Sequence, residues 1–181
     1  MKKRILAILL LLMMVLPMCA MAAGNGVYGL TKDKLATRNG PSTEYMGTAT
    51  YSVKNQYIRI ISKAYDVNGV CWLQVDIPYN NQYRRLYTGL KRFDETTVHL
   101  DWIPTEDEPY AYAQVKKNIN CKYGPGENYG TYSNIVLGKG TRVACIATEN
   151  GYVQVEFYGS NSKDGKTTFQ RCWVKDSDLS Y

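Results

Sequence analysis

Residues 39–45 read Asn-Gly-Pro-Ser-Thr-Glu-Tyr, and residues 123–129 read Tyr-Gly-Pro-Gly-Glu-Asn-Tyr. In both segments a Gly-Pro pair and a tyrosine are separated by three residues. Similar segments that recur in one order along a chain are the signature of an internal repeat. This turn therefore predicts that one structural plan is used twice.

Two further pairs of segments support the repeat. Residues 72–77 read Trp-Leu-Gln-Val-Asp-Ile, and residues 152–157 read Tyr-Val-Gln-Val-Glu-Phe. Near the end of each copy, Tyr-Thr at 87–88 corresponds to Trp-Val at 173–174. Because the three matches follow the same order, we assign the first copy to residues 23–94 and the second to residues 110–181.

Both copies show the alternation of apolar and polar residues that is typical of β-strands. In the first copy Leu73, Val75 and Ile77 alternate with polar or aromatic residues, and residues 153–157 repeat the pattern. The dipeptides at 68–69, 150–151 and 164–165 are Asn-Gly or Asp-Gly, which favour hairpin turns. Short strands joined by such turns predict an all-β protein made of small barrels or sandwiches.

The segment between the copies, residues 95–109, is acidic. It holds five acidic residues, two prolines and no lysine or arginine, whereas the flanking copies carry net charges of +5 and +3. This composition predicts a linker. The linker is either a solvated strap or a segment that docks on a basic copy, and we favour the strap because exposed ion pairs contribute little. Residues 101–103, Asp-Trp-Ile, are a candidate short packed segment.

The N-terminus predicts export. Three basic residues at 2–4 precede an apolar run over 5–16, and Ala-Met-Ala follows at 20–22. This is the pattern of a signal peptide, here residues 1–22 with cleavage after Ala22. Lipid attachment at Cys19 is the less favoured alternative, because the residues before it do not fit such a signal. The predicted mature chain has no second long apolar stretch, so we expect no transmembrane segment in it.

Charge and cysteines bound the possible chemistry. Cleavage would reduce the net charge from +6 to +3, which argues against a dedicated nucleic-acid binder. Cys145 and Cys172 fall at inward positions of neighbouring predicted strands and form a candidate disulfide. Two buried thiols are the favoured alternative, because the first copy has Ile60 and Leu86 at the matching places. No C-x-x-C pair occurs, so we predict neither a metal site nor a cofactor.

The segment Ala-Thr-Arg-Asn-Gly-Pro-Ser at 36–42, followed by a strand near Ile58 and another at 72–77, resembles the bacterial Src-homology-3-like (SH3-like) domain. The second copy is similar to this family in two segments. Residues 121–125 read Cys-Lys-Tyr-Gly-Pro, and residues 137–143 read Leu-Gly-Lys-Gly-Thr-Arg-Val. The first copy departs from the Lys-Gly-Thr hairpin of the family at residues 53–57. The resemblance implies two small SH3-like β-barrels in tandem, joined by the acidic linker.

The resemblance also implies a function. Domains of this family are commonly attached to exported bacterial hydrolases and are thought to hold them on the cell wall, but here no hydrolase is attached. We therefore expect a secreted or cell-wall-associated, non-catalytic protein that recognises peptidoglycan peptide or glycan. An extracellular protein–protein interaction module is the alternative, and a cell-wall hydrolase is a less favoured one. The only histidine, His99, lies in the linker with no thiol near it in the sequence, so we predict no catalytic residue.

Aromatic residues are the candidate ligand-binding positions. Strand alternation directs Trp72 and Tyr87 away from the core of the first copy, and Tyr152 and Trp173 take these places in the second. With Tyr45 and Tyr129 after the Gly-Pro turns, the six rings are expected to line shallow grooves for a peptide or sugar. The favoured alternative is that they are strand formers that pack on loops or on the other copy.

Overall fold

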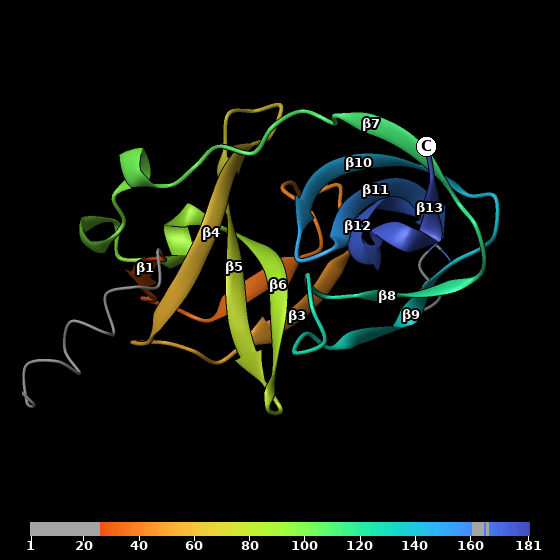
Figure 1. Cartoon of the computed structure of the whole chain (residues 1–181). Helices are drawn as coiled ribbons and strands as arrows, with labels where there is room; N and C mark the ends of the chain where they lie inside the picture. The colour runs from red at the N-terminus through yellow and green to blue at the C-terminus, as the bar shows by residue number, and fades with distance from the viewer. Residues whose placement is uncertain (1–25, 161–164, 166) are drawn as a thin grey trace, which may run out of the picture.

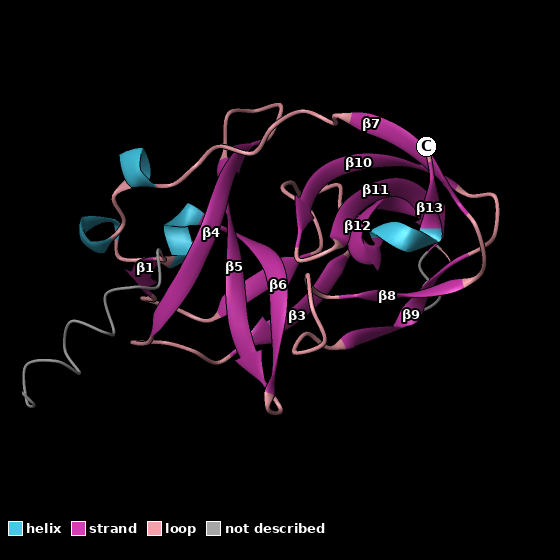
Figure 2. Ribbon diagram, viewed as in Figure 1, coloured by secondary structure: helices cyan, strands magenta, loops and turns pink. Residues whose placement is uncertain are grey.

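The computed structural model describes residues 26–160, 165 and 167–181. These residues form two antiparallel sheets, and the regular helical elements among them are short 3₁₀ turns (Figures 1 and 2). The all-β prediction is therefore confirmed. The predicted signal peptide, residues 1–22, lies outside the described residues.

The first sheet contains the strands β1 to β6, in the spatial order β1-β4-β5-β6-β2-β3. Their bounds are β1 Val27–Leu30, β2 Leu35–Arg38, β3 Gly47–Tyr51, β4 Tyr57–Tyr65, β5 Cys71–Tyr79 and β6 Gln82–Gly89. The 3₁₀ turns η2 (Leu90–Arg92), η3 (Glu95–Thr97) and η4 (Leu100–Trp102) follow.

The second sheet repeats this plan in the order β13-β7-β10-β11-β12-β8-β9. Its elements are β7 Ala111–Val115, β8 Ile119–Lys122, β9 Thr131–Leu137, β10 Arg142–Glu149, β11 Tyr152–Ser160, β12 Thr167–Lys175, η5 Asp176–Asp178 and β13 Leu179–Ser180. Apart from the added β13, each strand takes the place of one in the first sheet. Even the irregular pairing recurs, between Ile60 and Ser62 in β4 and between Cys145 and Ala147 in β10.

The cores follow from the alternation seen in the sequence. Leu73, Val75 and Ile77 on β5 are fully buried, as are Val153 and Val155 on β11. Gly69 and Gly151 adopt the positive φ angles that the predicted hairpin turns require. The tight turn between β5 and β6 was not predicted: it consists of Asn80 and Asn81, both at positive φ, a conformation that asparagine tolerates.

The candidate disulfide is wrong, because β11 lies between the two cysteines. Val155 pairs with Cys145 on one side and with Cys172 on the other. Two strand spacings place the Cα atoms about 9–10 Å apart, beyond the roughly 7 Å that a disulfide can bridge. Cys172 instead contacts Cys121, and burial together with this neighbour raises the pKa of the Cys172 thiol well above its ordinary value.

The acidic segment packs on the first sheet, contrary to the favoured strap. The backbone of Lys63 on β4 pairs with Thr105, and Ile103 is buried. Trp102 in the candidate packed segment remains 69% exposed and stacks on His99. Because Glu106 also binds Arg171 on β12 at 2.8 Å, the segment ties both sheets together.

Candidate functional site

The outer faces of β5–β6 and β11–β12 meet in a contact with approximate two-fold symmetry. Tyr129 after the second turn donates its hydroxyl proton to Asp76 on β5, at 2.8 Å, and Arg85 binds the same carboxylate at 2.8 Å. Tyr45 after the first turn donates to Glu156 on β11, which also accepts from Arg171. Each copy therefore inserts its turn tyrosine into an acid–arginine pair of the other copy.

Backbone hydrogen bonds follow the same symmetry. The amide of Met46 donates to the carbonyl of Phe169 at 3.3 Å, and the amide of Gly130 donates to the carbonyl of Tyr83 at 3.1 Å. Tyr87 breaks the symmetry, because the second sheet has Trp173 at this place. The buried hydroxyl of Tyr87 accepts hydrogen bonds from Gln74 at 2.7 Å and from Gln154 at 3.1 Å. Burial and the negative charge of Glu106 raise the pKa of the Tyr87 phenol far above its ordinary value, so this ring stays neutral.

The six candidate aromatic residues separate into two groups. Tyr45, Tyr87, Tyr129 and Trp173 lie at or beside the contact between the sheets, where Tyr87 is 1% exposed and Trp173 is 3% exposed. Tyr87 and Trp173 point away from their own cores, as strand alternation requires, but the other copy covers them, and it also contacts the two turn tyrosines. The expectation that they line an open groove is therefore corrected: packing on the other copy was the better alternative for this group.

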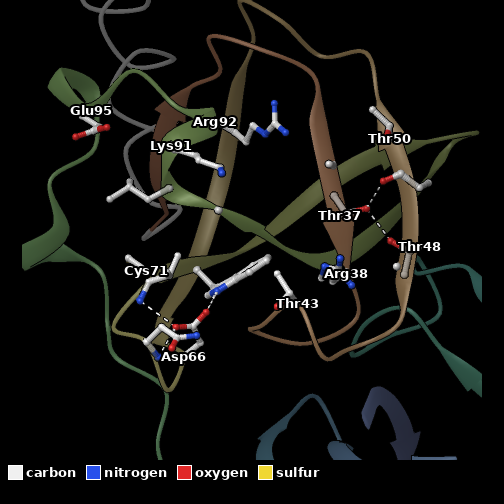
Figure 3. A pocket seen from close by; sticks show the side chains of 18 residues that line it. Thr37, Arg38, Thr43, Thr48, Thr50, Asp66, Cys71, Lys91, Arg92 and Glu95 are labelled. Carbon is white, nitrogen blue, oxygen red and sulfur yellow. Dashed lines mark hydrogen bonds between the residues drawn. The ribbon is translucent and has the colours of Figure 1, made fainter. Parts of the chain in front are cut away.

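Trp72 lines a cavity that we call the first groove. This open groove of about 810 Å³ lies between the β2–β3 hairpin, the β4–β5 turn and η2 (Figure 3). Its walls carry threonine hydroxyls from β2 and β3 and three basic side chains, those of Arg38, Lys91 and Arg92. The Trp72 indole donates to Asp66 at 3.1 Å, which fixes the ring against the groove.

Tyr152 lines the corresponding cavity of the second sheet, which we call the second groove. It has a volume of about 250 Å³ and is lined by residues that include Asn120, Lys122 and Lys175. Glu127 reaches over it from the turn, accepting from the Tyr152 hydroxyl at 2.6 Å and binding Lys122 at 3.0 Å. The first groove is the larger of the two, and at the second the Glu127 carboxylate binds two of the lining side chains.

No family model matches this chain, and neither does any curated protein. Within the described residues, no group of three or more His, Cys, Asp or Glu side chains is arranged to hold a metal ion. No helix in this part of the chain is long and apolar enough to cross a membrane. The geometry of the first groove is therefore the main guide to function.

Sequence reasoning missed most of the first groove. It selected Trp72 but not Arg38, although this arginine belongs to the turn motif, and it did not select Lys91 or the β3 threonines. Comparing the two turns position by position would have drawn attention to Thr43 and Glu127, which stand at the same place in segments of equal length. The contrast between an uncharged and an acidic residue was visible before the fold was known.

The Glu127 contacts have a measurable consequence. Hydrogen bonding from Tyr152, and then from Lys122 and Lys175, lowers the pKa of Glu127 to about 2. A carboxyl group with a lowered pKa in the folded state stabilises the fold above its ordinary pKa, and this contribution is lost as the pH falls through the lowered value. We expect a carbon-detected NMR titration of Glu127 to show a midpoint near pH 2.

Tyr152→Phe should move that midpoint upward, because the variant removes the largest stabilising contact of the ionised carboxylate. The titration of Asp33, whose carboxylate binds Arg92 in the first copy, is the reference and should not change. A Glu127 midpoint that Tyr152→Phe leaves in place would contradict the carboxylate contacts in the second groove.

Proposed function

We propose that this chain is an exported, non-catalytic binding protein that recognises cell-wall peptidoglycan, with SH3-like barrels as its two units. The observation that carries the proposal is the first groove. Its volume lies within the range of about 300–1,000 Å³ that is usual for ligand sites. It combines an aromatic residue, Trp72, with hydroxyl and cationic side chains, a mixture suited to a polar peptide or glycan.

The contact between the sheets supports different roles for the two units. Each sheet buries its turn tyrosine in the other, so the two units brace each other through Asp76, Arg85, Glu156 and Arg171. The open groove lies outside this contact, on the side of the first sheet formed by β2, β3 and η2 (Figure 3). We therefore assign ligand binding to the first unit and a supporting role to the second.

Blocking the groove tests the proposal. Thr50 lines the first groove and pairs with Ala36, while Val136 pairs with Asn120 at the equivalent place in the second sheet. Both side chains are exposed, so tryptophan is tolerated sterically at either position. We expect Thr50→Trp to reduce retention on purified sacculi at least tenfold, whereas Val136→Trp retains binding. Equal retention of the two variants would overturn the assignment of the groove.

A second function, extracellular protein–protein interaction, is favoured by one surface. Three aromatic residues, Tyr112, Tyr158 and Phe169, border a shallow hollow of about 500 Å³. Their side chains are exposed by 61%, 65% and 42%, respectively. Exposed aromatic residues that gather in this way mark interaction surfaces. Parallel retention assays with sacculi and with secreted proteins separate this function from wall binding.

A further inference from the structure

Glu127 shows how side chains that line a groove of this fold bind a carboxylate. Its carboxylate binds the Tyr152 hydroxyl at 2.6 Å, the Lys122 ammonium at 3.0 Å and the Lys175 ammonium at 3.2 Å. The side chain remains 74% exposed, so these polar contacts, and not burial, hold it in place. Three side chains that line the second groove therefore form a carboxylate site, and Glu127 is bound there.

The first groove is built from the same positions. Arg38 corresponds to Lys122: Arg38 pairs with Gly47 and Tyr87, and Lys122 pairs with Thr131 and Trp173 at the same steps of the second sheet. Trp72 corresponds to Tyr152 by the same logic, since they pair with Gly89 and Lys175, respectively. A basic and an aromatic side chain thus recur together in both grooves.

The turns above the two grooves also match closely. A Cβ atom added to Gly40 would lie 2.0 Å from Cδ1 of Tyr45, and one added to Gly124 would lie 2.0 Å from Cδ1 of Tyr129. Because backbone and tyrosine have the same relation in both turns, Thr43 and Glu127 project from equivalent positions. The first groove therefore has a threonine where the second has its carboxylate.

This difference leaves Arg38 without an acidic partner. Its Nη1 donates to the carbonyl of Tyr45 at 2.6 Å, and within the described residues it forms no ion pair. Of the two carboxylates that line the groove, Asp66 is engaged by the Trp72 indole and by the amides of its own turn, and Glu95 pairs with Lys32. The half-buried guanidinium thus keeps Nε and Nη2 for an acceptor from outside the chain.

We propose that the first groove binds a peptide through a carboxylate that is held by Arg38 beside Trp72, at the place equivalent to that of Glu127 in the second groove. Guanidinium–carboxylate pairs are strong and directional. A peptide also suits the neighbouring surface, since β3 is an edge strand with exposed residues along the groove. This inference deepens the proposed function and rests on it: the peptide is a wall stem peptide, which carries free carboxylates.

Synthetic stem peptides of the sequence Ala-γ-Glu-Lys-Ala test the inference by isothermal titration calorimetry. One peptide has both carboxylates free, one is amidated at the C-terminus, one is amidated at glutamate, and one is amidated at both. We expect the doubly amidated peptide to bind the full chain at least tenfold more weakly than the free acid. The two singly amidated peptides identify which carboxylate Arg38 holds.

A turn exchange provides the second measurement. Thr43→Glu places in the first groove the residue that fills the second, so it should compete with the peptide, and we expect at least tenfold weaker binding than for Thr43→Gln. Arg38→Gln should also abolish the preference for the free acid. Thr43 is exposed, and unchanged thermal midpoints would establish that these variants fold.

These experiments distinguish failure of the carboxylate site from failure of the proposed function. Retention of the chain on sacculi with equal affinity for free and doubly amidated peptides would overturn the carboxylate site and leave the proposed function standing. Equal affinities of Thr43→Glu and Thr43→Gln for the free-acid peptide would also overturn the carboxylate site. So would the absence of binding of either peptide form. No retention on sacculi, together with a preference for the free-acid peptide, would overturn wall binding and leave the carboxylate site.

Discussion

Asp76→Ala is expected to lower the free energy of unfolding by about 3–5 kcal/mol, the cost typical of removing one partner from a buried ion pair. Asp76 is 4% exposed at its side chain and Arg85 is 1% exposed. The variant leaves the guanidinium of Arg85 buried, with Glu149 as its remaining acidic partner. It also removes the acceptor of the Tyr129 hydroxyl, so the turn of the second copy loses its anchor on the first sheet.

Chemical denaturation with urea measures this effect. Asp33→Ala is the matched control, because Asp33 also binds an arginine, Arg92, at 2.6 Å, but does so with 55% of its side chain exposed. We expect this control to change the stability by less than about 1 kcal/mol. Similar losses in the two variants would contradict a buried network that stabilises the contact between the sheets.

Gly124→Ala is expected to lower the free energy of unfolding by about 3 kcal/mol, the upper part of the range that is usual for overpacking. The added Cβ would lie 2.0 Å from Cδ1 of Tyr129. This ring cannot easily turn away, because it is buried and its hydroxyl is bonded to Asp76 and Arg85. The turn must therefore open, or the tyrosine must leave the contact between the sheets.

Gly47→Ala is the control for this prediction. No atom lies within 4 Å of a Cβ added at Gly47, so the change should be neutral or stabilising by less than about 1 kcal/mol through the unfolded chain. Chemical denaturation with urea, followed by circular dichroism, would measure the loss of stability in Gly124→Ala. A variant as stable as Gly47→Ala would show that the Gly-Pro turn does not need glycine.

Much of the fold was predictable because short-range patterns encode it. The alternation at Leu73, Val75 and Ile77 places these side chains on one face of a strand whatever that strand meets. The order of the repeated segments also predicts that the same strand order occurs twice, as the two sheets show. The six aromatic residues were harder to interpret. Alternation correctly turned Tyr87 away from its own core, but it could not reveal that the second sheet covers it.

The Gly-Pro turn illustrates the division between local and tertiary information. The amino-acid pattern alone predicts that two equal turns exist, that each contains a tyrosine, and that both lie within all-β units. The packing of the two sheets brings each tyrosine into an acid–arginine pair of the other unit, and it places Glu127 against Tyr152 and Lys122 at one groove and Thr43 at the other. Local patterns determine which side of a strand a residue occupies, whereas its partners depend on how distant segments pack, and no short-range pattern encodes that packing.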